Sequence, residues 1–163
     1  MTWPLDSTRP SYHTAPGLYC GVGGNGHHGS TATDGLRDRG QLRAGDCLAG
    51  PNLGLNTSNP WPYLFDTTPC TGPHLAEVFF SGNAWAQSMA YPGDSAVYSQ
   101  ADASCSAAFS TYDGKDSSES AFTFGWISPT PRWDWASGDR QLVCLAYPWS
   151  GSVVDYSIKG SDR

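Results

Sequence analysis

Hydrophobic and polar residues recur with two different periods along this chain, and each period predicts one kind of secondary structure. After a turn at residues 91–94, small and apolar residues recur at helical spacing: Val97, Ala101, Cys105, Ala108, Phe109 and Tyr112. This spacing predicts one amphipathic helix over about 94–113, with Asp94 as its N-terminal cap and Gly114 in the left-handed position that ends it. Cys105 is then expected on the buried face of the helix.

Shorter apolar runs, some of them alternating with period two, predict the strands. They cover residues 42–47, 63–66, 75–80, 121–127, 140–147 and 153–158. The run at 140–147 is apolar on both faces, which indicates a strand buried on both sides. Together these elements predict an α+β fold, in which one main helix packs on a small, mostly antiparallel sheet.

Residues 1–39 show no such apolar periodicity. They are rich in Gly, Ser, Thr, Pro and Asp, and they contain Cys20 as well as the pair His27 and His28, which we interpret as solvated. We therefore interpret 1–39 as a flexible leader and 40–160 as one folded domain. The leader has too few apolar residues to offset an ordering entropy of about 1–2 kcal/mol per residue, so it is predicted to be dispensable for folding.

Composition and charge exclude several classes of function. Only 15% of the 163 residues are charged, while Gly (19), Pro (12) and Trp (7) are abundant, which favours a loop-rich domain over a helical bundle. The formal net charge is −6, and between Ala44 and Asp139 only Lys115 and Arg132 are basic. Such a surface is expected to repel nucleic acid, because no basic cluster can neutralise phosphates. No apolar run approaches about 18 residues, so no membrane insertion is expected, and residues 1–20 lack the order of a secretory signal.

Four of the five cysteines lie inside the predicted domain: Cys47, Cys70, Cys105 and Cys144. None is two to four residues from another, so the close pairs typical of zinc or iron–sulfur sites are absent. Widely spaced cysteines in even number predict disulfides and an oxidising compartment outside the cytosol. No metal and no other cofactor is expected.

An ordered set of motifs runs through the same domain. It consists of Gly45-Asp46-Cys47, Pro69-Cys70, Pro73-His74, Glu77-Val78, Tyr91-Pro92-Gly93, Trp135, Gly138-Asp139-Arg140 and Cys144. In this order the motifs resemble the septum formation family, a small cysteine-containing domain of actinobacterial cell-envelope proteins, over roughly residues 40–160. The resemblance implies an exported or membrane-tethered domain linked to cell-division septa, with no established enzymatic activity.

Two disulfides are predicted, Cys47–Cys70 and Cys105–Cys144. Each joins neighbouring landmarks, and the second would tie the helix to a central strand. In the chain-entropy model, closed loops of about 24 and 40 residues stabilise a fold by roughly 3.5–4 kcal/mol each. Cys20 is expected to stay free.

His74 is the one histidine inside the domain. In a strand, His74 and Glu77 would point to opposite faces, so they are not expected to share a ligand. We interpret His74 as a buried residue whose imidazole bonds the backbone near Cys70, with a binding or catalytic role as the alternative.

The late Trp-rich segment leaves two interpretations open. Trp133 and Trp135 either fill the core or form an exposed surface that stacks on glycan or anchors a protein, and Trp133 is the better candidate for exposure. Gly138, Asp139 and Arg140 are interpreted as a structural turn, in which Arg140 pairs with a carboxylate or with backbone carbonyls.

These observations favour a non-enzymatic, extracytoplasmic binding or scaffolding domain associated with septum formation or other envelope processes. Its partner would be an envelope or septal protein, or cell-wall glycan. One alternative is a cell-wall carbohydrate-binding module that uses the Trp-rich loop, and another is a hydrolase built around His74. The chain has no Gly-x-Ser-x-Gly elbow, and the domain offers a single histidine as base, so no catalytic residue is predicted.

Overall fold

The computed structural model describes residues 35–50, 64–129, 134–161 and 163. Its elements are, in chain order, β1 (Gly35–Arg37), the 3-10 helix η1 (Arg39–Gln41), β2 (Cys47–Leu48), β3 (Phe65–Thr68), β4 (Ala76–Asn83), α1 (Asp94–Asp113), β5 (Phe122–Ile127) and β6 (Gln141–Pro148). The predicted α+β fold is confirmed: within these residues one α-helix accompanies one six-stranded sheet.

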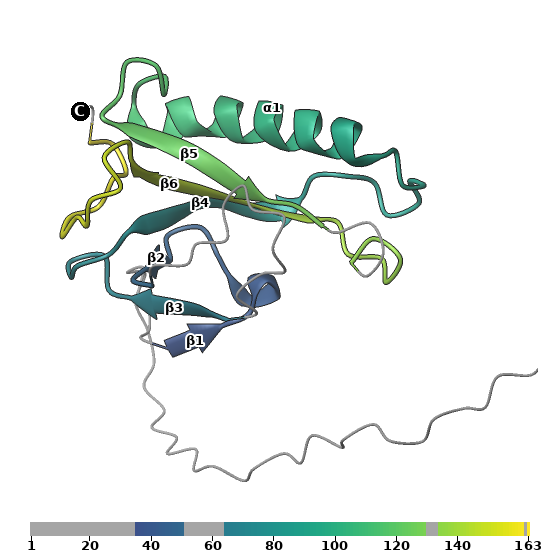
Figure 1. The fold of residues 1–163 in the computed structure, drawn as a ribbon, viewed down its shortest axis with the longest axis horizontal. Helices are drawn as coiled ribbons and strands as arrows, with labels where there is room; N and C mark the ends of the chain where they lie inside the picture. The colour runs from purple at the N-terminus through teal and green to yellow at the C-terminus, as the bar shows by residue number, and fades with distance from the viewer. Residues whose placement is uncertain (1–34, 51–63, 130–133, 162) are drawn as a thin grey trace, which may run out of the picture.

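The strands are ordered β1-β3-β2-β4-β6-β5 across the sheet, and every pair is antiparallel. Helix α1 lies along β5, β6 and β4 on one side, while β1 and β3 lie beyond β4 on the other side (Figure 1). The sheet therefore has one face covered by the helix and another face covered by its own N-terminal part.

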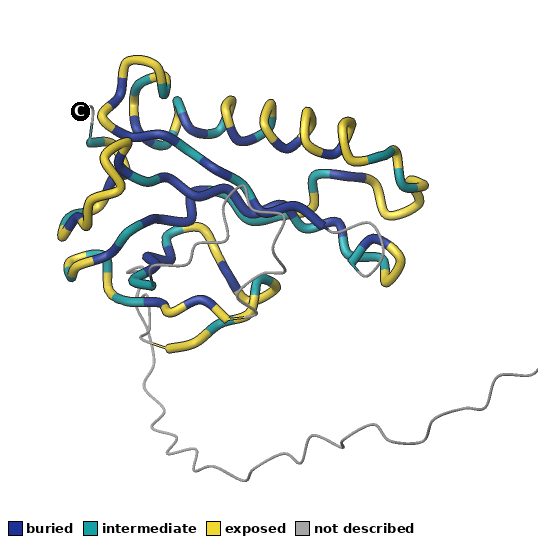
Figure 2. Tube along the Cα trace, in the orientation of Figure 1, coloured by how far each residue is buried: buried dark blue, intermediate teal, exposed yellow. Residues whose placement is uncertain are grey.

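This arrangement creates two apolar cores, one on each face of β6. Figure 2 shows that buried residues run along the central strands and recur along α1. The helix-side core includes Val97, Ala101, Cys105, Phe109, Phe122, Leu142, Cys144 and Ala146. The second core consists of Leu42, Leu48, Phe65, Ala76, Val78, Ile127, Val143 and Leu145. Successive residues of a strand point to opposite faces, so the apolar run of β6 supplies both cores in alternation, as the sequence predicted.

Helix α1 occupies Asp94–Asp113, the predicted range, and Cys105 is fully buried on its inner face. Gly114 ends the helix with φ +99°, in the left-handed region that glycine adopts without steric cost. The prediction that Asp94 caps the helix is wrong. Gly93 holds the cap position without a side-chain bond, and the Asp94 carboxylate instead accepts a hydrogen bond from the Tyr91 hydroxyl.

Several strand predictions need correction. The expected strand at 153–158 is absent from the described residues, where only Val154 bridges the backbone of His74. The expected strand at 42–47 is reduced to Cys47–Leu48, because Leu42 directly follows η1. The strand predicted at 63–66 is described as Phe65–Thr68.

The folded part also begins earlier than the predicted boundary near residue 40. Strand β1, within the stretch interpreted as leader, pairs with β3 over Gly35–Arg37. The Arg37 guanidinium lies 3.1 Å from the Asp46 carboxylate, and Arg39 forms an ion pair with Asp139. Residues 35–39 therefore belong to the sheet and its contacts.

Both predicted disulfides are confirmed. Cys47 joins Cys70 with 5.3 Å between their Cα atoms, and Cys105 joins Cys144 with 5.6 Å. The second bond ties α1 to β6 through the helix-side core, as expected, while the first connects β2 to the loop between β3 and β4. The predicted state of Cys20 lies outside the described residues.

Candidate functional site

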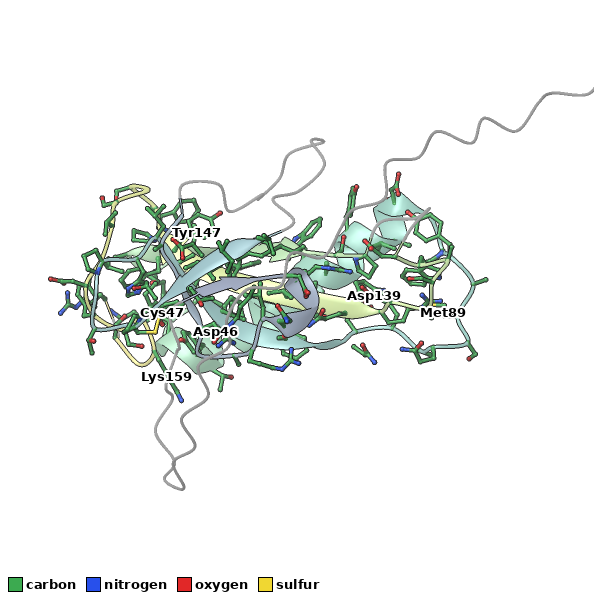
Figure 3. The ribbon with its side chains drawn as sticks, turned by 90° about the horizontal axis from the view of Figure 1, so that it is seen from below. Asp46, Cys47, Met89, Asp139, Tyr147 and Lys159 are labelled. Atoms are coloured by element: carbon green, nitrogen blue, oxygen red, sulfur yellow. A yellow bond between two sulfur atoms is a disulfide. The ribbon has the colours of Figure 1, made fainter. Side chains whose placement is uncertain are left out.

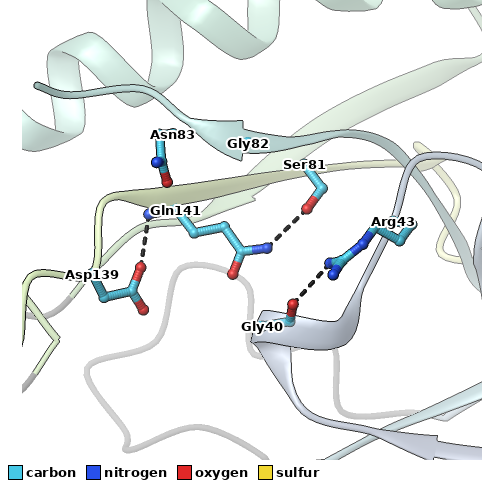
Figure 4. A pocket seen from close by; sticks show the side chains of 7 residues that line it. All are labelled: Gly40, Arg43, Ser81, Gly82, Asn83, Asp139 and Gln141. Carbon is cyan, nitrogen blue, oxygen red and sulfur yellow. Dashed lines mark hydrogen bonds between the residues drawn. The ribbon is translucent and has the colours of Figure 1, made fainter. Parts of the chain in front are cut away.

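An open pocket lies where the ends of β4 and β6 meet the segment that contains and follows η1 (Figure 4). Its volume is about 510 Å³. Polar and small residues line it: Gly40, Arg43, Ser81, Gly82, Asn83, Asp139 and Gln141. The pocket is therefore suited to a ligand that forms hydrogen bonds.

The register of β4 and β6 brings the polar side chains together. Asn83 lies opposite Gln141 in the ladder, and Ser81 lies opposite Val143. Cross-strand partners project from the same face, and Val143 belongs to the second core, so the polar residues continue that face past its apolar part. Gln141 Nε2 donates to Ser81 Oγ over 2.9 Å, and Ser81 Oγ donates to the carbonyl of Leu42 over 2.8 Å. These two bonds fix the floor of the pocket.

Arg43 supplies a positive charge to the pocket. Its Nη1 donates to the carbonyl oxygens of Gly40 and Leu42, each over 2.8 Å, and the side chain is exposed. In the part of the chain that the structure describes, no carboxylate forms an ion pair with Arg43. Two carbonyls therefore orient the guanidinium, while its charge remains open to an anionic group of a ligand.

The motif that was interpreted as a structural turn ends at this pocket. Asp139 lines the pocket, pairs with Arg39 and accepts the backbone N–H of Gln141 over 2.8 Å. Arg140 is only 5% exposed, and its guanidinium carbon lies 3.9 Å from the ring centre of Trp135. It donates to four backbone carbonyls, those of Gln87, Met89, Trp135 and Asp139. The expected pairing of Arg140 with backbone carbonyls is thus observed, and Gly138 precedes it with φ +88°.

Trp135 is part of the core and offers no exposed surface for stacking. It is 5% exposed, and its ring packs edge-on against Trp85 and Tyr91 at centroid distances of 5.6 and 5.4 Å. Its Nε1 donates to the carbonyl of Met89 over 3.1 Å. Trp133, the other tryptophan considered for recognition, lies outside the described residues.

A second polar group is enclosed around Glu77, near the opposite end of β4. The Glu77 side chain has no solvent exposure and accepts four hydrogen bonds. They come from His74 Nε2 (3.1 Å), the Tyr112 hydroxyl (2.6 Å), Ser157 Oγ (3.1 Å) and the backbone N–H of Ile158 (2.8 Å). One carboxylate therefore connects the loop before β4, the last turn of α1 and the C-terminal segment.

The expectation that His74 and Glu77 face opposite sides of one strand is wrong. Strand β4 begins at Ala76, so His74 lies in the preceding loop, where its backbone bonds Val154 in both directions. Nδ1 lies 2.8 Å from the carbonyl oxygen of Gly72, and Nε2 lies 3.1 Å from Glu77 Oε1. The Gly72 carbonyl and the Glu77 carboxylate are both acceptors, so the arrangement fits an imidazole that is protonated on both nitrogens.

The pKa shifts agree with a charged pair. Burial alone would lower the pKa of His74, but its hydrogen bonds to Glu77 and Gly72 and the charges of Glu77 and Asp155 raise that pKa above its usual value. Burial alone would raise the pKa of Glu77, but the bonds from His74 and Tyr112 lower it. Burial and the bond to Glu77 raise the pKa of the Tyr112 hydroxyl. The carboxylate and the imidazolium hold each other in their charged forms.

The Cys47–Cys70 disulfide lies next to this cluster; Figure 3 shows Cys47 beside Asp46 at the end of the sheet away from Asp139. The two sulfurs and a carboxylate oxygen of Glu77 all lie within 4.8 Å of one another, which is a possible spacing for metal ligands. The sulfurs are bonded to each other, however, and the acceptor positions of Glu77 are occupied. In this oxidised form the group presents no thiolate to a metal.

Most pocket residues were missed by sequence reasoning. The strand predicted at 75–80 stops before Ser81 and Asn83, whereas β4 extends through both. The apolar run that predicted this strand ends at Phe80, so it gave no signal for the two polar residues. The approach of Arg43 could not be read from sequence, because it depends on how η1 packs over β4 and β6.

The fold and the pocket define a small disulfide-bonded α+β domain with an open, polar pocket. A family model described as septum formation matches residues 18–157, so the chain belongs to the septum formation family. Membership indicates a role related to cell division or the cell envelope, and the two disulfides are consistent with a location outside the cytoplasm. No curated protein and no solved structure matches the chain. Among the described residues, no helix has the length and apolar character needed to cross a membrane.

Proposed function

We propose that this domain is a non-enzymatic binding or scaffolding module of the extracytoplasmic cell envelope, and that the pocket at the ends of β4 and β6 takes its ligand. The observation that carries the proposal is the pocket itself, which combines the exposed guanidinium of Arg43, without an ion-pair partner among the described residues, with the exposed Asn83. The ligand is a segment of an envelope or septal protein, or a cell-wall glycan with its attached peptide. Both offer hydroxyl, amide and carboxylate groups that complement this lining.

The surroundings of His74 support a binding role over hydrolysis. The imidazole has no exposed surface, and both of its nitrogens are engaged with Gly72 and Glu77. A general base must reach the proton that it removes, directly or through one water. In this arrangement neither nitrogen of His74 is free to take a proton from an external substrate, so the alternative of a hydrolase built around it has no geometric support.

The buried position of Trp135 also argues against the Trp-rich loop as a recognition surface built on this residue. Its ring is enclosed by Trp85 and Tyr91, so a glycan cannot stack on it. Recognition through hydrogen bonds in the polar pocket therefore replaces the Trp-rich loop in the proposal, and glycan remains a candidate ligand.

The test compares binding of the full chain and of pocket variants. Sedimentation with purified cell wall and pull-down from an envelope fraction measure the two ligand classes. Arg43→Ala and Asn83→Ala should each weaken binding at least about tenfold, because each removes a hydrogen-bonding group worth about 1.4 kcal/mol or more when charged or desolvated. Lys159→Ala is the matched control, since Lys159 is an exposed cation that does not line the pocket.

Two results would contradict the proposal. Equal binding by wild type, Arg43→Ala and Lys159→Ala would remove the pocket as the binding site. Hydrolysis of cell-wall material by the purified chain, lost on substitution of His74, would overturn the non-enzymatic proposal. Circular dichroism of each variant shows whether the fold is retained.

A further inference from the structure

The two disulfides differ in their access to solvent. Cys105 and Cys144 are both fully buried in the helix-side core. Cys47 is also fully buried, but Cys70 lies in the loop after β3 and is partly exposed. Of these four cysteines, only Cys70 is partly exposed, so it is the one that an external thiol would approach.

The Cys47–Cys70 bond also has a buried acid–base pair beside it. A carboxylate oxygen of Glu77 lies within 4.8 Å of both sulfurs, and Glu77 Oε1 lies 3.1 Å from His74 Nε2. The carbonyl oxygen of Gly45 lies 3.4 Å from Cys70 Sγ, so a reduced Cys70 thiol would have an acceptor already in place. A purely structural disulfide needs none of these neighbours.

We propose that Cys47–Cys70 is a thiol–disulfide exchange site for an external thiol. Cys70 is the sulfur that is attacked, Cys47 is the leaving sulfur, and the Glu77–His74 pair is the proton relay. Cys105–Cys144 is the inert structural bond of the same domain.

The proposed exchange proceeds in two steps. An external thiolate attacks Cys70 Sγ, the disulfide breaks, and its electron pair goes to Cys47 Sγ, which receives a proton from His74 through the Glu77 carboxylate. A second external thiolate then attacks the external sulfur of the mixed disulfide and releases Cys70, which takes its proton from solvent. Two external thiols are oxidised to one disulfide, and the cysteine pair gains two electrons and two protons. The two protons that the external thiols release on forming thiolates balance the one taken by Cys70 and the one that restores the His74 imidazolium.

The charged groups around the site decide how the exchange depends on pH. His74 faces Glu77 from the loop before β4, Tyr112 faces it from α1, and Asp155 acts on His74 from the C-terminal segment. Next to Cys47, Asp46 is paired with Arg37. Among the described residues that donate to Glu77, His74 is the one whose ordinary pKa lies near neutral pH.

Reduction of the Cys47–Cys70 bond would also change contacts elsewhere in the fold. Cys70 and Gly72 belong to the same turn, in which Gly72 N–H bonds the carbonyl of Pro69, and Gly72 in turn accepts the His74 bond. Opening the disulfide therefore frees the turn that orients His74, the residue whose backbone pairs with Val154. The redox state of one bond is thus linked to the docking of the C-terminal segment.

The first test uses the full chain with Cys20→Ser, which leaves only the four domain cysteines. The folded protein is equilibrated with reduced and oxidised glutathione at graded ratios, quenched with acid, alkylated and mapped by mass spectrometry. We expect a glutathione adduct on Cys70, and reduction of Cys47–Cys70 at ratios that leave Cys105–Cys144 intact. An adduct on Cys47, or loss of both disulfides together, would overturn the proposal.

The second test separates a proton relay from a merely structural role. Reduction of Cys47–Cys70 by dithiothreitol is followed across the pH range and corrected for the dithiothreitol thiolate present. Glu77→Gln should slow the reaction about tenfold or more near neutral pH, the smaller end of acid–base contributions. If that variant does not fold, Tyr112→Phe removes one hydrogen bond to Glu77 while keeping the ring, and should move the pH profile upward.

Tyr147→Phe is the matched control, because its hydroxyl bonds the Phe124 carbonyl at 3.4 Å and does not contact Glu77. Its profile should coincide with that of the wild type. An unchanged profile in the folded Glu77 or Tyr112 variant would refute the relay, whatever the reactivity of Cys70.

Discussion

Arg140 and Glu77 are both charged and almost fully enclosed, yet they are stabilised in different ways. Arg140 is surrounded by neutral groups, because its guanidinium donates to four backbone carbonyls and lies over the ring of Trp135. Glu77 has a charged partner in His74 and three further donors. A buried charge is tolerated only with such compensation, and the two residues therefore fix the loop around Trp135 and the C-terminal segment respectively.

Replacing Arg140 by lysine tests the first of these arrangements. Lysine keeps the charge but cannot span several carbonyls with a planar fork, so some of them would be left without a donor. Arg140→Lys should lower the free energy of unfolding by about 2 kcal/mol or more. Arg43→Lys, at an exposed arginine, should change it by less than about 0.5 kcal/mol. Urea unfolding measures both, and equal effects would contradict the role given to Arg140.

The His74–Glu77 pair predicts how stability depends on pH. The pKa of Glu77 is lowered in the fold, so its contribution is present above the usual value of about 4.3 and is lost as pH falls through the lowered pKa. The pKa of His74 is raised, so its contribution is complete below about 6.5 and is lost as pH rises through the raised pKa. The pair should therefore stabilise most between these values. Thermal unfolding of the wild type, followed by circular dichroism across pH, should show a loss of stability at the acidic and at the alkaline end of this range. The Glu77→Gln variant should show neither loss. Parallel curves of melting temperature against pH for the two proteins would refute the role of the pair.

At the scale of elements, the sequence was most informative where one pattern decides one element. Apolar residues that recur about every four positions predicted α1 over its observed range. The run at 140–147, which is apolar on both faces, predicted that β6 is buried on both sides, and β6 does contribute to both cores. The disulfide pairs followed the same landmarks. These elements depend on local periodicity, which a single sequence carries.

The elements that were missed depend on contacts far apart in the chain. Strand β1 contains Gly35 and only one apolar residue, Leu36, which is exposed, so no apolar pattern marks it; it forms because β3 offers an edge. The segment at 153–158 has an apolar pattern but forms only one bridge, because Glu77 binds its backbone at Ile158. The pocket was missed for the same reason, since only tertiary packing brings Arg43 and Asn83 to the same pocket.

The disulfide between α1 and β6 gives a prediction at the element scale. In the chain-entropy model its loop, with a sequence separation of 39, stabilises the fold by about 4 kcal/mol, and the helix has no other covalent link to the sheet among the described residues. Replacing Cys105 and Cys144 by alanine should lower the free energy of unfolding by about this amount. The matched variant without Cys47 and Cys70 should lose slightly less, since its separation is 23. Guanidinium unfolding under non-reducing conditions measures both, and a loss below about 1 kcal/mol for the first would contradict the entropic account.

At the scale of the whole molecule, the sheet joins two halves for which we propose different tasks. Its C-terminal half, β4, β6 and β5, is covered by α1 and holds the fully buried Cys105–Cys144 disulfide. Its N-terminal half, β1, β3 and β2, carries the partly exposed Cys70 bond and, through η1, one wall of the pocket. Ligand binding and thiol exchange are thus proposed for opposite ends of β4. The N-terminal half of the sheet contributes to both proposed sites.

That importance makes the start of the folded unit a testable question. Sequence reasoning predicts that residues 1–39 are dispensable, whereas the structure places Arg37 against Asp46 and Arg39 against Asp139. A chain that begins at Gly35 should therefore unfold like the full chain. A chain that begins at Gln41 lacks β1 and both ion pairs, which are partly buried. Its free energy of unfolding should fall by about 2 kcal/mol or more, which corresponds to a fall of several degrees in melting temperature.

Cell-wall sedimentation of the chain that begins at Gln41 should weaken as well, because Arg39 holds Asp139 at the pocket. Equal melting of all three chains would restore the boundary near residue 40, and an equal fall in both shortened chains would show that residues 1–34 pack on the domain.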